Sequence, residues 1–504
     1  MTRRPVSHSA LRTPHSALLR RLARLLPAGE LSFDPAVLAA HAGDKWFASH
    51  LPEAVALPRS TRSVATLLRF ANRHQIPVTP RGSGHGYVGG AVPVRGGIVL
   101  SLARMNRIKE INAADFVAVV QAGVNTQKLQ EAVEARSLFY PPDPASRKDT
   151  FIGGNIATNA GGPRCLKYGV TRDYVLGLEA VLADGSVVRL GGRTHKNKTG
   201  FELHRLFVGS EGLLGIVTEA TLKLLPLPPY RACLAVGFGS MRSAVRALHA
   251  IFGAGFLPAA LELADAFTLN AAYQRLRRLE AGPRTEEDNQ LSSAEPLAGQ
   301  SKIKIQKSKI PYLAALRDCR AHLIVELDGQ VNSVRGEIRA LSRIIAPQKP
   351  LFIQTGLGAE ECEQVWQIRR EFSYALRDTG LTKLNEDIVV PRGRLEDLFA
   401  FAARLQKRHG LAIACFGHAG DGNIHTNIMV DLQQPRAKQR SDAALNELFA
   451  QVLAWGGAIT GEHGIGLAKQ RWWPMAVSNE ARALHRTIKQ ALDPKGILNP
   501  GKFV

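Results

Sequence analysis

Apolar and polar positions of this 504-residue chain recur in patterns that predict helices and short strands from about residue 50 onward. The first clear helix has Val64, Leu67, Leu68 and Ala71 on one face. The same patterning predicts further helices over 126–135, 242–252, 333–345, 360–378 and 395–409. It predicts strands over 98–102, 117–120, 216–225, 232–238, 260–263, 322–327 and 351–354. The proline-rich run Pro226–Pro229 indicates a domain boundary between the two halves of this series.

Residues 414–429 predict a hairpin that carries candidate chemistry. Asp421-Gly422 is a strong two-residue turn signal, because a type I′ turn needs positive φ at both central residues. That turn would set His418 opposite His425, with Cβ atoms roughly 4.5–5.5 Å apart. Two such imidazoles can chelate one metal ion, and Glu462 would complete a set that leaves a coordination position open. The alternative is that both histidines are ordinary cross-strand or loop residues.

Three glycine-rich stretches lie in the first half of the chain, over Arg81–Gly90, Ile152–Gly162 and Gly209–Gly215. Glycine lets a backbone approach a ligand closely and turn its N–H groups toward it. None of the three is a Rossmann fingerprint or a P-loop. One such stretch alone is more often a structural turn, but three together predict loops that share a large dinucleotide.

The predicted helix 360–378 carries a charge on its apolar stripe. Val365, Arg369, Phe372 and Leu376 lie at positions i, i+4, i+7 and i+11. A guanidinium there needs an anionic partner. The partner is either an internal carboxylate or the carboxylate of a substrate, and periodicity leaves both interpretations open.

Composition narrows the class of protein. Hydrophobic residues make up 45% and charged residues 21%, and no apolar run approaches the roughly 18 residues of a membrane span. The net charge is +22, but the basic residues are spread out and accompany no nucleic-acid motif, so we expect no nucleic-acid partner. The five cysteines form no CxxC pair, which argues against an iron–sulfur cluster in this chain and fits free thiols.

Two segments are expected to lie outside the folded domains. Residues 1–30 are rich in arginine, with no acid before Glu30 and leucines on one helical face. They predict either a transit peptide or membrane-surface anchor, or a segment outside the fold. We favour the second, which is either a disordered, dispensable extension without core residues or the result of a start codon assigned too far upstream. The charged, low-complexity stretch 276–320 predicts a flexible surface insertion.

Six motifs occur in an order that supports a family resemblance, namely PRGSGHGYVGGAVP, TFIGGNIATNAGGP, GSEGLLGIVTEATLKLLPLP, FGHAGDGNIH, ITGEHGIG and DPKGILNPGK. Over about 50–504 the chain resembles FAD-linked oxidases of the vanillyl-alcohol-oxidase/p-cresol-methylhydroxylase type. Within them it resembles the D-2-hydroxyacid branch, which includes D-lactate dehydrogenase, the flavin subunit of glycolate oxidase and D-2-hydroxyglutarate dehydrogenase.

The resemblance implies an α+β fold, with a two-subdomain PCMH-type FAD-binding domain over 46–228. An α+β cap domain with an antiparallel sheet would follow over 229–504, and 456–504 would return toward the flavin. The residues expected at FAD are Arg81, Gly82, Ser83, Gly84, His85, Gly86, Gly153, Gly154, Asn155, Thr158, Asn159, Gly209, Glu211, Gly212, Gly215, Ile216 and Asn499. His85 stands where this branch more often has threonine and where some relatives attach the flavin covalently, so covalent and non-covalent FAD both stay open.

The resemblance also implies roles at the substrate. His418, His425 and Glu462 match residues that bind a divalent metal, and such a set suits Zn, Mn or Fe. His463 matches the base that takes the hydroxyl proton, and Arg369 matches the residue that holds the carboxylate. The expected reaction is oxidation of a D-2-hydroxyacid by hydride transfer to flavin N5.

The substrate expectation is a lactate- or glycolate-like acid, because Asn385 stands where 2-hydroxyglutarate enzymes have a lysine. Two other functions stay open, a metal-free FAD oxidase of another alcohol and a non-catalytic flavin subunit that relays electrons. The electron acceptor is also open among a quinone, a cytochrome, an iron–sulfur partner subunit and oxygen. We expect a cytoplasmic location or peripheral attachment to the inner membrane, and a mitochondrial one in a eukaryote.

Overall fold

The computed structural model describes residues 15–281, 310 and 312–504, and its chain divides into two compact units. The first unit contains Met1–Gly161, Val170–Leu227 and Glu462–Val504, and the second contains Gly162–Gly169 and Pro228–Gly461. Within the described residues no helix combines the length and the apolar character that crossing a bilayer requires.

The first unit contains two main sheets. The smaller has the strand order β1 (Leu31–Ser32), β2 (Ala54–Ala56), β4 (Ile98–Ser101) and β3 (Val78–Arg81), parallel except for β1. The larger is antiparallel, with the order β5 (Ile108–Asn112), β6 (Val117–Gln121), β10 (Ile216–Lys223), β8 (Val175–Val181) and β9 (Val187–Gly191). A short pair joins β7 (Leu138–Phe139) to β11 (Leu225–Pro226).

Helices surround these sheets. They are α1 (Ser16–Leu25), α2 (Pro35–Ala40), α3 (Thr61–His74), α4 (Thr126–Glu134), α5 (Ile152–Thr158), the 3₁₀ turn η1 (Thr171–Tyr174), α7 (His204–Phe207), α14 (Trp473–Ala476) and α15 (Asn479–Leu492). Ser60 caps α3, since its side chain accepts a hydrogen bond from Ser63 N–H. After α15 the chain returns to β3, where Val78 N–H donates to Ile497 O at 2.8 Å and Asn499 N–H donates to Val78 O at 2.8 Å.

Helix α1 corrects the interpretation of residues 1–30 as a disordered extension without core residues. Residues 1–14 lie outside the described part, but Leu19, Leu22 and Leu26 are buried in the same core as α3 and the smaller sheet. The leucine stripe is therefore the buried face of a core helix. An amphipathic stripe alone does not reveal whether a membrane or a neighbouring helix covers it.

The second unit is built on one antiparallel seven-stranded sheet. Its strand order is β15 (Phe352–Leu357), β12 (Tyr230–Phe238), β14 (Ala321–Gly329), β13 (Ala260–Asp265), β17 (Ala412–His418), β18 (Asn423–Val430) and β16 (Thr382–Val389). The sheet and helices together confirm the α+β fold class and the antiparallel cap sheet.

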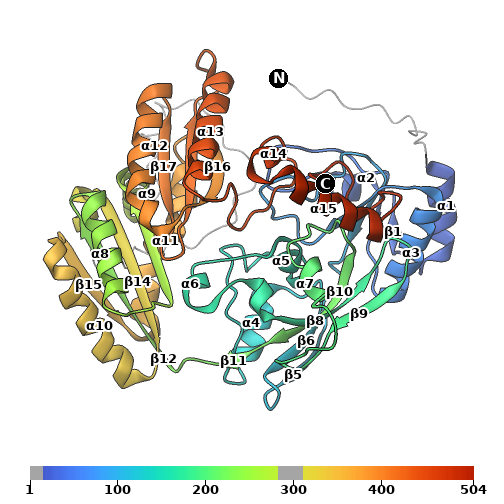
Figure 1. Ribbon diagram of the computed structural model, residues 1–504, viewed down its shortest axis with the longest axis horizontal. Helices are drawn as coiled ribbons and strands as arrows, with labels where there is room; N and C mark the ends of the chain where they lie inside the picture. The colour runs from blue at the N-terminus through green and yellow to red at the C-terminus, as the bar shows by residue number, and fades with distance from the viewer. Residues whose placement is uncertain (1–14, 282–309, 311) are drawn as a thin grey trace. The chain divides into compact units, whose positions relative to one another are not determined.

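Helices cover both faces of this sheet (Figure 1). One face carries α8 (Met241–Gly253), α10 (Val331–Ile345), α12 (Leu395–His409) and α13 (Ala437–Ala454). The other carries α9 (Ala266–Ala281) and α11 (Gly358–Arg377). Shorter elements are α6 (Cys165–Tyr168) and the 3₁₀ turns η3 (Ala314–Asp318), η4 (Ala346–Gln348) and η5 (Arg392–Arg394).

The segment Gly162–Gly169 belongs to the second unit although the chain on either side belongs to the first. Lys167 forms an ion pair with Asp328 of β14, and Tyr168 OH donates to the same carboxylate at 2.8 Å. This excursion follows directly from the second glycine-rich stretch.

Three local expectations need correction. The predicted glycine loop 152–162 begins as helix α5, which ends at Asn159 with φ +51°. The predicted insertion 276–320 is shorter, because α9 continues to Ala281 and Leu276, Ile310 and Leu316 are buried in the core. Residues 282–309 and 311 lie outside the described part. The predicted pairing of His418 with His425 is wrong, because β17 sets His418 opposite Asn423 and Phe416 opposite His425.

Replacing Leu22 by alanine should destabilise the first unit by about 2–5 kcal/mol, the usual cost of removing a fully buried leucine. Chemical denaturation followed by tryptophan fluorescence would measure this. Leu25→Ala is the matched control, because Leu25 lies on the same helix and is 58% exposed, so its change should stay within about 0.5 kcal/mol. Equal stability of the two variants would show that α1 contributes nothing to the core.

Candidate functional site

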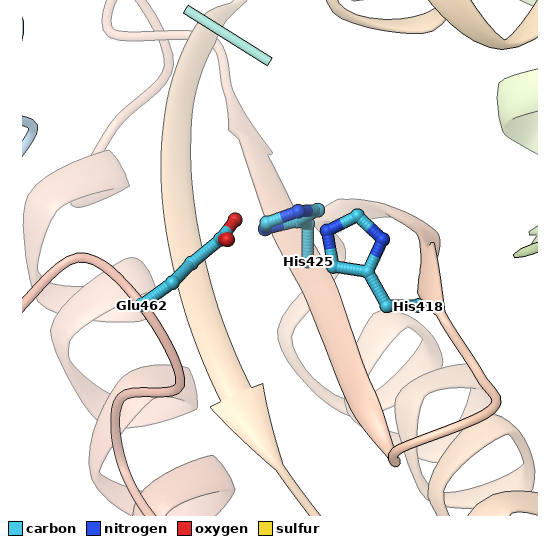
Figure 2. Close-up of side chains that lie close together, drawn as sticks. All are labelled: His418, His425 and Glu462. Carbon is cyan, nitrogen blue, oxygen red and sulfur yellow. The ribbon is translucent and has the colours of Figure 1, made fainter. Parts of the chain in front are cut away.

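The side chains of His418, His425 and Glu462 lie together, and their candidate ligand atoms are all within 4.8 Å of one another. His418 ends β17, His425 lies within β18, and Glu462 follows directly on the last residue of the second unit. Figure 2 shows the three side chains pointing toward one another, and both histidines are buried. Their ring centroids are 5.5 Å apart. The diagonal placement across two strands therefore brings the imidazoles together even though they are not directly opposed.

The loop between β17 and β18 has four residues, Ala419–Gly422, instead of the predicted two. Gly422 has φ +85°, and a Cβ there would lie 2.1 Å from Val390 O, so the position requires glycine. A Cβ on Gly420 would lie 2.4 Å from the side chain of Leu166. Contacts beyond the hairpin thus select the longer loop.

Asp387 fixes the backbone that leads to Glu462. This fully buried carboxylate accepts hydrogen bonds from Asn423 Nδ2 at 2.7 Å, from Thr460 Oγ1 at 3.0 Å and from Gly461 N–H at 2.8 Å. Asp387 also lies directly opposite His425 in the pairing of β16 with β18. The residue before Glu462 is therefore anchored to the strand pair that carries the histidines.

Glu262 of β13 joins the predicted ligand His418 to Arg369 of α11. Its Oε1 lies 2.5 Å from His418 Nδ1, and its Oε2 accepts from Arg369 Nε at 2.5 Å. Burial alone would raise the pKa of Glu262, but His418 and Arg369 outweigh burial and lower that pKa to about 2. The Arg369 guanidinium also lies 4.9 Å from the centroid of the Phe416 ring. Of the two partners that periodicity left open for Arg369, the internal carboxylate is thus present. The two terminal nitrogens of Arg369 can still bind a second anion.

His463 and the glycine-rich run after it belong to the first unit. The His463 ring lies 5.2 Å, centroid to centroid, from the ring of Tyr87, which lies within the first glycine-rich stretch. Glu211 accepts hydrogen bonds from Ile465 N–H at 2.7 Å and Gly466 N–H at 2.9 Å. Burial raises the pKa of Glu211, against those two hydrogen bonds. Glu211, expected at FAD, therefore holds the loop that carries His463.

The glycines expected at FAD form a close approach of two backbones. A Cβ added to Gly82 would lie 3.4 Å from Gly154 Cα, whereas a Cβ on Gly154 would meet no atom within 4 Å. Gly84 and Gly209 have φ of +75° and +81°. Open space beside glycine backbone is what a pyrophosphate needs.

Several polar residues expected at FAD bond instead to the protein. Arg81 Nη1 donates to Gly43 O at 2.5 Å, Asn155 Nδ2 to Thr126 Oγ1 at 2.7 Å, and Asn499 Nδ2 to Glu211 O at 2.8 Å. The Thr158 hydroxyl donates to Gly154 O, and the Asn159 amide oxygen accepts from Arg172 N–H. The remaining expected residues lie in loops or at the start of a strand, namely Gly86, Gly153, Gly212, Gly215 and Ile216. Backbone amides around these residues are thus the groups left to contact a cofactor.

Four polar residues on the face of the seven-stranded sheet that carries His418 and His425 were not identified from the sequence as site residues. They are Glu262, Asp387, Lys383 and Asn427. Burial lowers the pKa of Lys383 to about 8, and its Nζ donates to Ser373 Oγ at 3.1 Å. Glu262 could have been suspected from the sequence, because it is an acid within the apolar strand pattern ALELA.

Glycine backbones with open space beside them suit the pyrophosphate of a dinucleotide cofactor. Residues 227–503 match the family model described as FAD linked oxidases, C-terminal domain, and residues 52–191 match the FAD binding domain. The chain belongs to the FAD-linked oxidase family, which confirms the resemblance, and FAD is its cofactor.

Named relatives agree with this assignment. The chain is 37% identical to the glycolate oxidase subunit GlcD of Bacillus subtilis, over 90% of this chain and 89% of that protein. It is 32% identical to a D-lactate dehydrogenase of Anaerostipes hadrus, over 90% and 89%. Its fold resembles substrate-bound p-cresol methylhydroxylase, with a TM-score of 0.75 and 20% identity over 97% of this chain and 96% of that one. The protein is thus an FAD-linked oxidoreductase.

We expect FAD to be held without a covalent bond to His85. Both ring nitrogens already have polar neighbours, since Nδ1 lies 3.2 Å from Ser83 Oγ and Nε2 lies 3.6 Å from Asp149 Oδ2. Acid precipitation should therefore leave all flavin in the supernatant. A yellow, fluorescent pellet that becomes colourless in His85→Ala would contradict this expectation.

Proposed function

We propose that this protein oxidises a D-2-hydroxyacid of the lactate or glycolate type to the 2-oxoacid, using FAD, a divalent metal and His463 as base. The observation that carries the proposal is the dipeptide Glu462-His463. Glu462 lies with the two histidines, and the His463 ring lies 5.2 Å from the tilted ring of Tyr87 in the first glycine-rich stretch. One short segment thus serves a candidate metal and a candidate proton acceptor.

The residues present fit both groups. Glycine backbones at Gly82 and Gly154 leave open space for FAD, which when bound supplies the acceptor for the α-hydrogen. Two imidazoles and a carboxylate are donors that Zn, Mn and Fe accept, and a bound ion supplies a Lewis acid for the substrate hydroxyl. The candidate ligand atoms lie within 4.8 Å of one another. Small side-chain rotations would let all three reach one metal ion at metal–ligand distances of about 2.0–2.2 Å.

His463 takes the hydroxyl proton in this proposal. The loop that carries it is held by Glu211 through two backbone amides, so the imidazole starts from a fixed position. Arg369 orients the substrate through its terminal nitrogens, because its Nε is already bonded to Glu262. Fixing the carboxylate restricts how the Cα–H bond points, which is the main contribution of a positioning cation.

The amides of Asn385 and Asn427 support a monocarboxylate substrate. These residues lie directly opposite each other on β16 and β18, on the same face as His425. Asn427 Nδ2 donates to Ala414 O and His425 O, which fixes its Oδ1 as an acceptor. Among the described residues neither amide oxygen receives a hydrogen bond. A second carboxylate, which only accepts hydrogen bonds, would face these two acceptor oxygens, whereas a hydroxyl could donate to them.

Relatives support the chemical class and a partner protein. The names glycolate oxidase subunit and D-lactate dehydrogenase both denote oxidation of short 2-hydroxyacids by those proteins. The word subunit in the first name favours electron transfer from this flavin to a partner chain. The direct test is anaerobic mixing of the purified protein with D- and L-2-hydroxyacids while flavin absorbance is followed. Bleaching by D-lactate or glycolate but not by L-lactate or a dicarboxylate such as D-2-hydroxyglutarate is expected, and no bleaching by any hydroxyacid would refute the proposal.

Removing the metal ligands should abolish activity without releasing flavin. His418→Ala, His425→Ala and Glu462→Gln each remove one donor of the cluster, whereas the glycine loops that hold FAD remain unchanged. Metal analysis, flavin content and turnover of the three variants would test this. Full activity of all three in chelator-treated buffer would eliminate the metal site.

The base and the positioning cation should affect different kinetic constants. His463→Ala should lower kcat by about 10²–10⁴ because proton removal loses its acceptor. Arg369→Met should mainly raise KM, by an amount equivalent to about 2–5 kcal/mol if the ion pair with substrate is desolvated. Stopped-flow flavin reduction separates the two effects, and normal reduction in His463→Ala would exclude its role as base.

A further inference from the structure

Glu262 occupies an unusual position in the second unit. Its side chain is only 2% exposed, and each of its two carboxylate oxygens contacts a different residue. Oε1 lies 2.5 Å from His418 Nδ1, and Oε2 accepts from Arg369 Nε at 2.5 Å. Both contacts span more than 100 residues of sequence, so the tertiary fold alone creates them.

The contact to His418 selects one tautomer of the imidazole. An ionised carboxylate only accepts hydrogen bonds, so Nδ1 must carry the proton and Nε2 must carry the lone pair. Figure 2 shows one ring nitrogen of His418 turned toward His425 and the other turned away. Because Nδ1 faces Glu262, the nitrogen available to the cluster is Nε2. A carboxylate behind a histidine in this way fixes the ring orientation and raises its basicity as a ligand.

The contact to Arg369 selects the orientation of the guanidinium. The group has five N–H donors in a planar fork, and Glu262 takes the Nε–H. The Phe416 ring lies 4.9 Å from the guanidinium carbon and limits its tilt. Within the described part of the chain the two terminal nitrogens form no hydrogen bond. The guanidinium of Arg369 is therefore fixed through its Nε–H, and the four N–H groups on its terminal nitrogens point away from Glu262.

We infer that Glu262 is a positioning residue that sets His418 as an Nε2 metal ligand and Arg369 as a terminal-nitrogen carboxylate ligand at the same time. The inference rests on the proposed function, since it assigns the means by which that site is held ready. Metal affinity and substrate affinity therefore both depend on one buried carboxylate. Loss of this one group should weaken both, although it touches neither metal nor substrate.

The test compares two identical substitutions in one sheet. Glu262→Gln keeps the shape of the side chain but removes its charge. Glu326→Gln is the matched control, because Glu326 is 1% exposed on the neighbouring strand β14 and contacts Arg231 and Trp366 instead of His418 and Arg369. Metal affinity is measured on FAD-loaded, metal-free protein by titration with Zn²⁺ against a chromophoric chelator, which needs no turnover.

Glu262→Gln should weaken Zn²⁺ binding by about 10–100-fold, the usual effect of removing such a supporting carboxylate. It should also raise the KM for the hydroxyacid at least tenfold, while flavin content stays unchanged. Glu326→Gln should alter neither constant. Zn²⁺ affinity of Glu262→Gln within threefold of the parent protein would overturn the inference.

A second pair of variants covers the case in which Glu262→Gln does not fold because Arg369 is left buried without its counterion. Arg369→Met should bind Zn²⁺ normally, since Glu262 still holds His418. Glu262→Gln/Arg369→Met leaves no unpaired charge and should bind Zn²⁺ about 10–100-fold more weakly than Arg369→Met. Equal Zn²⁺ affinity of these two variants also overturns the inference.

His418→Ala separates this inference from the proposed function. If His418→Ala binds Zn²⁺ as the parent does, the metal assignment itself fails. If His418→Ala loses Zn²⁺ while Glu262→Gln retains it, only the role of Glu262 fails.

Discussion

Two carboxylates buried in the sheet of the second unit, Asp387 and Glu262, impose the constraint on which the candidate site depends. An ionised carboxylate removed from water costs several kcal/mol unless donors and positive groups surround it. Asp387 meets this demand with an amide, a hydroxyl and a backbone N–H, and Glu262 meets it with His418 and Arg369. Asp387 accepts hydrogen bonds from the two residues that precede Glu462, and Glu262 contacts His418 and Arg369 themselves. The positions of His418 and Glu462 therefore follow from the hydrogen bonds that these buried carboxylates require.

Local patterns predicted most of the secondary structure of the second unit. The helix expected over 395–409 matches α12, since its amphipathic period and the stop at Gly410, with φ +60°, are both encoded within a few residues. The hairpin register was not predictable in the same way. Asp421-Gly422 suits a two-residue turn, but the contact of Gly422 with Val390, the residue directly after β16, favours a four-residue loop. That contact depends on a strand some 30 residues away in sequence, which no local rule includes.

The candidate site was predictable as a set of residues but not as a network. Glycine spacing and motif order led to His418, His425 and Glu462, which the structure brings together. Periodicity placed Arg369 on an apolar stripe yet gave no information about its partner in β13. The same limit applied to α1, whose leucine stripe was visible although the helix that covers it was not. Sequence patterns identify a face, and only the tertiary fold identifies what lies against it.

The excursion of Gly162–Gly169 into the second unit has a consequence for how the protein can be divided. The chain passes between the units four times, after residues 161, 169, 227 and 461. A single cut at the apparent boundary near residue 228 would leave the second unit without the partners of Asp328 and the first without the C-terminal segment that bonds to Val78. Neither half is a continuous piece of polypeptide. The two units are therefore expected to be inherited and expressed together, with no short route by which one could be exchanged for a relative's.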